Sequence, residues 1–464
     1  MRGRLGLIAL ITVALLASAA PAAHAARGLQ VGLTDSVFES ADSGTRGLWL
    51  DRAVSGRSDL VILGAPWSAI APANRPVGFN PRNPLDPSYS WGALDDSVRD
   101  ATARGLKVVI LVAGGAPPWA EGKHRPPGAT QGTWKPNPAD LADFGHAIAA
   151  RYSGAFPSLP RVRYFQLWGE VNLDQYLTPQ WRHKRPFAPR HYRAMLNAFY
   201  GAVKGVEQSD KVVTGGTAPY GDPRRGGDRI QPVAFWRGVL CLKGRGLRTA
   251  PCKHPAHFDV FAHNPINVGG PTRHARNADD ASTPDIGRLR RVLKKAERTH
   301  RALPKGKKPI WATEIWWDSK PPDPHGIPTG RQARFLEQSF YVLWKQRVET
   351  VVWFLIRDQA ATPDFASTFQ TGLFLHNGQP KPAYTAFRFP FVGDPKGRRR
   401  ARVWGEAPGP GSVAVQRKVG GHWRTAKHVH AGGNRVFTGT IHVRGKAKLR
   451  AVQGSEQSLV WPLR

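Results

Sequence analysis

Short apolar runs alternate with longer amphipathic segments along most of the chain. Eight runs rich in valine, isoleucine and leucine predict β-strands, because β-branched side chains fit a pleated surface. They cover residues 29–34, 60–65, 107–113, 164–169, 211–215, 258–263, 309–313 and 350–355. Several are apolar on both faces, as residues 108–112 are, which is typical of parallel strands buried on both sides.

Between these strands the apolar positions follow the period of helices that bury one face. The predicted helices cover residues 91–104, 140–151, 189–207, 284–300 and 331–346. Roughly eight strands alternating with helices predict a (β/α)8 barrel. A doubly wound sheet alternates in the same way, but no glycine-rich phosphate loop follows the first strand, which argues against its dinucleotide-binding form.

The pattern changes after residue 394. The run 396–400 is polar and predicts a linker. Short alternating runs broken by glycine and proline follow at residues 402–404, 412–417, 423–428, 436–443, 448–452 and 459–462. This alternation predicts a small antiparallel β domain of the sandwich kind. We therefore expect a barrel domain over residues 27–392 and a small all-β domain over residues 395–464.

The first 25 residues predict a secretory signal peptide. Arg2 and Arg4 form a basic start, residues 5–16 are apolar, and residues 23–25 form a small-x-small cleavage site. The apolar stretch is short for a membrane span, which leaves an uncleaved anchor as the alternative. We expect a secreted protein with no integral membrane segment after signal cleavage.

The chain of 464 residues carries 67 lysines and arginines against 33 aspartates and glutamates, a net charge of +34. This charge fits an acidic partner such as a uronic-acid polymer, a teichoic acid or a nucleic acid. The arginines are dispersed along the whole chain, however, which favours a general compositional bias. Because aromatic residues lie on apolar strands and do not interleave with a basic stripe, we expect no nucleic-acid partner.

The sequence contains two cysteines, Cys241 and Cys252. Export permits disulfides, so their closeness predicts a local disulfide, with two unpaired thiols as the alternative. Two cysteines alone cannot fill a tetrahedral metal site, even with His254 and His257 nearby, so we expect no metal.

Two of the predicted strands end on a lone carboxylate, Glu170 and Glu314. Burying an unpaired carboxylate costs free energy, so a core strand has little use for one. In a barrel these residues end the fourth and seventh strands, at the face where catalytic residues lie. Glycoside hydrolysis needs two carboxyl groups, one protonated and one ionised, and neither a metal nor an organic cofactor. Either glutamate alone is also explained by a structural ion pair.

The motifs around both glutamates resemble those of clan A glycoside hydrolases, a large group of retaining (β/α)8 enzymes. The sequence pattern is most similar to that of the branch that contains β-xylosidases and iduronidases. The fourth strand of that group usually ends Trp-Asn-Glu-Pro-Asn, and residues 168–172 read Trp-Gly-Glu-Val-Asn. Its seventh strand ends Thr-Glu followed by aromatics, and residues 313–317 read Thr-Glu-Ile-Trp-Trp. The resemblance covers most of residues 29–390 and implies that Glu170 is the acid/base and Glu314 the nucleophile.

Three positions depart from the family pattern. Gly169 replaces an asparagine that hydrogen-bonds the sugar 2-hydroxyl, an apolar residue in 60–63 replaces an arginine, and Ile266 replaces a tyrosine. A second hypothesis is therefore a barrel that binds carbohydrate or a cell-wall polymer without hydrolysis. A third is an interaction module for acidic polymers, which rests on charge alone.

Candidate substrate-binding residues are aromatic rings that stack on pyranose faces and polar side chains that bind hydroxyls. They are Trp67, Trp119, Trp168, Asn172, His263, Asn264, Trp316, Trp317 and Trp353. Each has a structural alternative, because tryptophan also fills cores and asparagine and histidine also hold turns.

Overall fold

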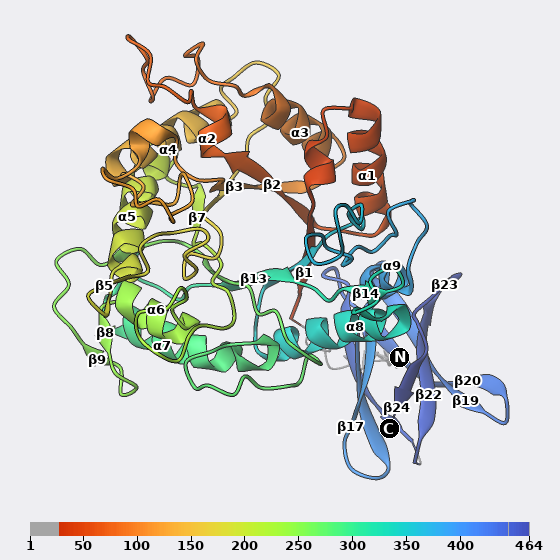
Figure 1. The fold of residues 1–464 in the computed structure, drawn as a ribbon. Helices are drawn as coiled ribbons and strands as arrows, with labels where there is room; N and C mark the ends of the chain where they lie inside the picture. Colours follow the sequence, from red (N-terminus) through yellow and green to blue (C-terminus); the bar gives the residue numbers. More distant parts are fainter. Residues whose placement is uncertain (1–26, 444, 464) are drawn as a thin grey trace, which may run out of the picture.

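We describe the protein from a computed structural model, in which residues 27–443 and 445–463 are described. The predicted signal peptide, residues 1–25, lies outside the described residues. Eight parallel strands form a ring with helices around it, and antiparallel strands follow at the C-terminal end (Figure 1). The predicted (β/α)8 barrel followed by a small all-β region is confirmed.

Each strand of the ring matches a run predicted from the sequence, within a few residues. The strands are β1 (Gln30–Thr34), β2 (Leu60–Pro66), β3 (Lys107–Ala113), β4 (Tyr164–Leu167), β7 (Lys211–Val213), β11 (Phe261–His263), β13 (Ile310–Ile315) and β16 (Thr350–Phe354). Their order is β11-β13-β16-β1-β2-β3-β4-β7. A parallel bridge between Val213 and Val260 joins the two ends, where the Thr214 N–H donates to the Val260 carbonyl at 3.0 Å. The sheet is therefore closed into a barrel.

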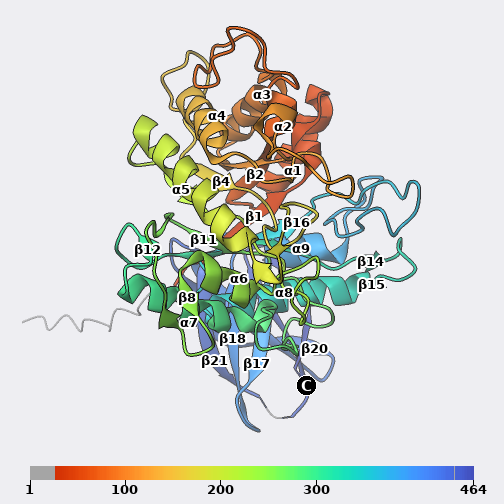
Figure 2. The same cartoon turned by 60° about the vertical axis from the view of Figure 1, so that its left-hand side comes forward.

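Helices surround the strands (Figure 2). They are α1 (Ser43–Ser55), α2 (Trp67–Ile70), α3 (Gly92–Ala103), α4 (Pro138–Arg151), α5 (Ala188–Val206), α6 (Pro232–Val239), α7 (Ile286–Arg298), α8 (Thr329–Lys345) and α9 (Pro382–Arg388). Local chemistry explains their starts: the Asn137 side chain caps α4 by accepting from Ala139 N–H at 2.8 Å, and Pro138 fits the first turn. The sequence did not predict α1, α2, α6 and α9. The last three are short, and α1 buries Arg46 and Gly47 beside Trp49, which obscures its apolar period.

Buried side chains fill the interior of the barrel below the C-terminal ends of its strands. Leu60, Ile62, Val109, Val213, Val260, Ala262, Trp311 and Val352 form one buried cluster inside the ring. The ring of Tyr164 packs on that of Trp311 at a centroid distance of 5.2 Å. A second, larger cluster lies between the strands and the helices. Because the lower interior is packed, the space for a ligand lies at the C-terminal ends of the strands.

The C-terminal region consists of two antiparallel sheets. One contains β17 (Phe391–Pro395), β18 (Arg400–Glu406) and β21 (Val436–His442); the other contains β19 (Gly411–Val419), β20 (His422–Ala431), β22 (Ala447–Gln453), β23 (Glu456–Gln457) and β24 (Trp461–Leu463). Its first strand begins at Phe391, slightly before the predicted change of pattern. Ion pairs join it to the barrel, among them Arg57 with Glu456 at 2.6 Å and Asp59 with Arg435 at 2.9 Å.

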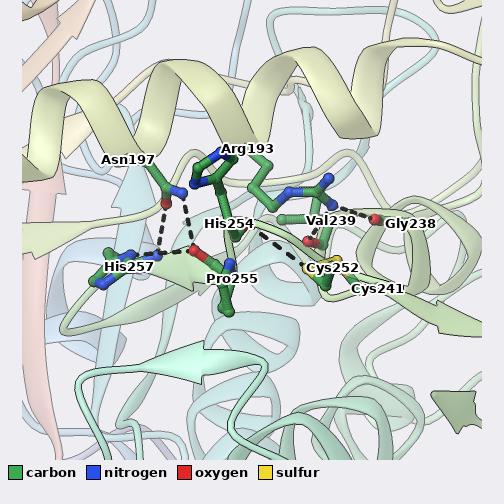
Figure 3. The surroundings of a disulfide bond; sticks show 9 residues. All are labelled: Arg193, Asn197, Gly238, Val239, Cys241, Cys252, His254, Pro255 and His257. Carbon is green, nitrogen blue, oxygen red and sulfur yellow. Dashed lines mark hydrogen bonds between the residues drawn. A yellow bond between two sulfur atoms is a disulfide. The ribbon is translucent and has the colours of Figure 1, made fainter. Parts of the chain in front are cut away.

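The predicted disulfide is confirmed. Cys241 and Cys252 are bonded and enclose the hairpin of β8 (Leu242–Lys243) and β9 (Arg248–Thr249). Helix α5 holds this segment, because Arg193 donates to the carbonyls of Gly238 and Val239 and Asn197 donates to that of Pro255 (Figure 3).

The described residues form neither a membrane-spanning helix nor a cluster of metal ligands. Among the helices of residues 27–443 and 445–463, none has the length and apolarity that crossing a membrane requires. Within the same ranges, no group of three or more His, Cys, Asp and Glu side chains is arranged to hold a metal ion.

Candidate active site

Glu170 and Glu314 lie at the C-terminal ends of β4 and β13. Glu314 is the last residue but one of β13, and Glu170 follows the end of β4 by three residues. The backbone at Trp168 (φ 69°) and at Glu170 (φ 26°) is left-handed, which costs about 1–3 kcal/mol for each such residue. The turn is held by the Trp168 N–H, which donates to the Val112 carbonyl at 2.7 Å. Strain of this kind is found at sites where the position of a side chain matters more than stability.

The side chain of Asn264 joins the two carboxyl groups. Its Nδ2 lies 3.4 Å from Glu170 Oε1 and 3.2 Å from Glu314 Oε2. Because one nitrogen reaches both oxygens, they are at most about 6.6 Å apart, the sum of the two distances, within reach of the 5–5.5 Å carboxyl separation of retaining glycosidases. Thr313 Oγ1 donates to Asn264 Oδ1 at 2.8 Å, which fixes the amide with its nitrogen toward the glutamates.

Burial raises the pKa of both glutamates, and the charge of Glu170 raises the pKa of Glu314 further. Two such groups titrate as a pair, so the pair holds one proton near neutral pH. Hydrogen bonds decide which group holds it. Glu314 accepts from Trp316 Nε1 at 2.9 Å and from Asn264 at 3.2 Å, whereas Glu170 accepts, within the described part of the chain, from Asn264 alone at 3.4 Å. Donors favour the ionised form, so the proton is placed on Glu170 and the charge on Glu314.

Both glutamates line a cavity of about 610 Å³ at the mouth of the barrel. Its other walls come from several strand ends and from the loops after β3, β4 and β11, and they include Thr34, Ile62, Leu111, Gly114, Thr130, Thr133, Gln166, Trp168, Gln175, Tyr176, Phe354 and Phe369. None of the lining residues is arginine, lysine or histidine. The charge of the cavity wall therefore comes from the two glutamates.

Of the predicted substrate-binding residues, Trp168, Asn264 and Trp316 line the cavity. Trp168 is buried, and its Nε1 donates to the Tyr176 carbonyl at 2.8 Å, so its ring forms the floor beside Glu170. Trp316 packs edge-on against Phe369 at 5.4 Å. The barrel therefore brings an aromatic surface to each of the two glutamates.

The other four predicted tryptophans lie outside the cavity. Trp67 is fully buried and stacks on Phe144 at 5.8 Å. The indole nitrogens of the other three donate to backbone carbonyls: Trp119 to Pro72, Trp317 to Gly269 and Trp353 to Thr371. The structure thus places these four side chains where they pack the barrel and hold its loops.

Asn172 and His263 are fully buried behind the cavity wall. The Asn172 side chain accepts from the Ala218 N–H at 2.8 Å and donates to the Ile230 carbonyl at 2.9 Å. His263 lies between Thr217 Oγ1 at 2.8 Å and the Ala281 carbonyl at 2.7 Å, and burial lowers its pKa to about 4. Both side chains fix the loops that carry Glu170 and Asn264.

Gln166 and Tyr176 line the cavity although the sequence did not single them out. Gln166 is 3% exposed, and its buried Oε1 is an unsatisfied acceptor with no hydrogen-bond partner among the described residues. A polar residue within the apolar run 164–169 was a signal for it. Burial and the charges of Glu170 and Glu314 raise the pKa of Tyr176 to about 12, which keeps its hydroxyl protonated. Tyr176 lies in an irregular loop, where no pattern pointed to it.

The three departures from the family pattern all face the cavity. Gly169, Ile266 and, in β2, Ile62 belong to its wall. A Cβ atom on Gly169 would meet no heavy atom within 4 Å, so the space that a larger side chain would take is open.

Solved structures share this fold. A family 39 glycoside hydrolase from Bacteroides cellulosilyticus WH2 superposes with a TM-score of 0.55 at 14% identity, over 90% of this chain and 81% of that one. A monomeric β-xylosidase from Caulobacter crescentus CB15 gives 0.52 at 14% identity, over 91% and 96%. A GH5_18 protein from Streptomyces cattleya, solved with GlcNAc, gives 0.51 at 17% identity, over 78% and 79%. No protein-family model matches the sequence, and none of the curated proteins does. The chain shares its TIM-barrel fold with these structures.

Proposed function

We propose that the protein is a secreted retaining glycoside hydrolase that cleaves O-glycosidic bonds of an oligosaccharide or polysaccharide. The observation that carries this proposal is the pair Glu170 and Glu314, joined by Asn264 at the mouth of the barrel. Similarity in fold to a family 39 glycoside hydrolase and to a β-xylosidase adds support. The secretion part rests on the N-terminal sequence.

In the first step the Glu314 carboxylate attacks the anomeric carbon. The glycosidic C–O bond breaks, and the proton of Glu170 passes to the leaving oxygen. The protonation state favoured by the hydrogen bonds is the one that this step requires. The product is a glycosyl ester on Glu314, with Glu170 now ionised.

In the second step Glu170 acts as a base. It takes a proton from water, the water oxygen attacks the anomeric carbon, and the bond to Glu314 breaks. Two displacements at the same carbon restore the original anomeric configuration. The residues return to their first protonation states, so neither step needs a cofactor.

The sugar bound at the reacting position is neutral. A carboxylate or phosphate on that ring would enter a wall with no arginine, lysine or histidine and with the charge of the glutamate pair nearby. Gln166 and Tyr176, which line the cavity, supply polar side chains for its hydroxyl groups where Gly169 has no side chain. Trp316 and Phe369 offer the apolar surface for its ring face.

The test is hydrolysis of a panel of neutral aryl glycosides by the wild-type protein and by single Glu→Gln variants. Glu170→Gln and Glu314→Gln should each lower kcat by about 10²–10⁴-fold, with Glu170→Gln affecting poor leaving groups most. Glu207→Gln, on the surface after α5, serves as the matched control and should leave the rate unchanged. Hydrolysis that survives both active-site substitutions would refute the proposal.

A further inference from the structure

A basic groove lies beside the loop that forms one wall of the cavity. It consists of two adjoining hollows, of about 710 Å³ and about 680 Å³, around the hairpin of β5 (Trp181–Arg182) and β6 (Arg185–Pro186). Both hollows include Arg185, Pro186 and Arg190. The groove continues along the loop 222–231 and α6 to the β8–β9 hairpin, which lies beside β5 at the edge of the ring (Figure 1).

The lining of the basic groove is strongly positive. Its cations are Arg182, Lys184, Arg185, Arg190, Arg193, Arg224, Arg225, Arg237 and Lys243, and its acids are Asp222 and Asp279. Both acids are already paired: Asp279 with Arg237 at 2.6 Å, and Asp222 with Arg229 at 3.0 Å. The remaining exposed cations of the hairpin and of the loop, Arg182, Lys184, Arg185, Arg224 and Arg225, have no carboxylate partner among residues 27–443 and 445–463. They are free to bind an anion.

The cations also repel one another. Burial and the charge of Arg190 lower the pKa of Arg193, whose guanidinium donates to the carbonyls of Gly238 and Val239. Burial and the charge of Arg182 also lower the pKa of Lys135, a residue outside the lining of the groove. A bound polyanion would relieve this repulsion, and several contacts at once would add to its affinity.

The groove and the catalytic cavity share one loop. Gln175 and Tyr176 line the cavity, and the same segment reaches the groove five residues later at Trp181. The loop is fixed to the groove side by the Asp174 N–H, which donates to the Asp228 carbonyl at 2.9 Å. A chain of sugars that leaves the cavity over this loop would meet the basic groove.

We propose that the basic groove binds an anionic polysaccharide, a sugar chain with carboxylate or sulfate groups, one neutral residue of which enters the catalytic cavity. The second part of this proposal, the entry of a neutral residue into the cavity, rests on the proposed glycosidase function. A glycan fits better than a nucleic acid because the ring of Phe187, which lines the groove, stacks on His191 at 5.4 Å and is covered by Arg182, so it offers no free face to a base. The charged groups of the polymer thus bind away from the uncharged reacting ring.

The test measures binding by calorimetry with polygalacturonate, dextran sulfate, neutral dextran and a DNA duplex. One variant removes four exposed groove cations by Arg185→Gln, Arg190→Gln, Arg224→Gln and Lys243→Gln. A matched control removes four exposed cations of the C-terminal region by Arg398→Gln, Arg399→Gln, Arg424→Gln and Lys448→Gln. Both variants have the same net charge, so bulk electrostatics affects them equally.

We expect both anionic glycans to bind, neutral dextran not to bind, and affinity to fall steeply with salt. The groove variant should lose about tenfold or more in affinity, and the control less than about threefold. Equal losses in the two variants, no binding of either anionic glycan, or tighter groove-dependent binding of DNA would each overturn the proposal. Because binding is measured without turnover, a groove that binds glycan in a protein that cleaves no glycoside would refute the proposed function and leave the groove standing.

Discussion

Replacing Asn264 by alanine removes a side chain that donates to both Glu170 and Glu314, the proposed catalytic pair. The amide nitrogen lies 3.4 Å from Glu170 and 3.2 Å from Glu314, and it stabilises the ionised form of each. Without this donor the pKa of each carboxyl group should rise, which favours the protonated forms. The Asn264→Ala variant should therefore need a higher pH to reach its active state, in which Glu314 is ionised.

The size of this shift follows from the hydrogen bonds. A hydrogen bond to a charged group contributes about 1.5–3 kcal/mol, and the long distances place these at the lower end. One pKa unit corresponds to about 1.4 kcal/mol, so the acid limb of the pH profile should rise by about one unit. The same amide also positions both carboxyl groups for the reaction, so kcat should fall by about 10²-fold.

The assay is the pH dependence of kcat/KM on the best neutral aryl glycoside. Asn267→Ala is the matched control, because Asn267 lies in the same loop and donates to the Arg273 carbonyl at 2.9 Å, outside the cavity. It should keep the wild-type profile. If the acid limb of the Asn264→Ala profile stays at the wild-type pH or moves to lower pH, the electrostatic role of this amide is refuted.

Three further predictions concern stability and specificity. Because burial raises the pKa of both members of the glutamate pair, the folded state loses stability relative to the unfolded state as pH rises above the ordinary carboxyl pKa, so Glu314→Gln should gain about 2 kcal/mol in urea unfolding at pH 7 and nothing at pH 4. A gain that is the same at both pH values would contradict this sign. Gly169→Asn has open space and should raise kcat/KM up to about tenfold on glycosides with a 2-hydroxyl group, with no gain on 2-deoxy substrates; a gain on both would exclude a 2-hydroxyl contact. The double substitution Cys241→Ser and Cys252→Ser opens a loop with a sequence separation of 11 and should cost about 3 kcal/mol in guanidinium unfolding, whereas an unchanged midpoint would show that α5 alone holds the segment.

The sequence predicted the barrel because its strands are buried on both faces and therefore read as unbroken apolar runs. The same apolar runs made Glu170 and Glu314 recognisable, since a lone carboxylate at the end of such a run is unusual. Helix α1 was not predicted, because a buried Arg46 and the glycines of its first turns interrupt the apolar period that identifies a helix.

The arrangement around the glutamates depends on contacts that no local pattern encodes. Asn264 reaches both carboxyl groups only because Gly216 leaves room, since a Cβ atom there would come within 2.2 Å of Asn264 Oδ1. The positions of the tryptophans are likewise not encoded by a local pattern. Trp67 in the core and Trp316 in the cavity follow similar apolar strands, and only the packing of distant helices separates them.

The most direct test of the central claim is to trap the covalent intermediate. The protein is incubated with activated 2-deoxy-2-fluoro glycosides of neutral sugars, which slow the second displacement, and the labelled residue is identified by peptide mass spectrometry. We expect one fluorosugar ester per molecule, on Glu314, and none in Glu314→Gln. A label on another residue, or hydrolysis of the matching substrate with inversion of the anomeric centre, would contradict it.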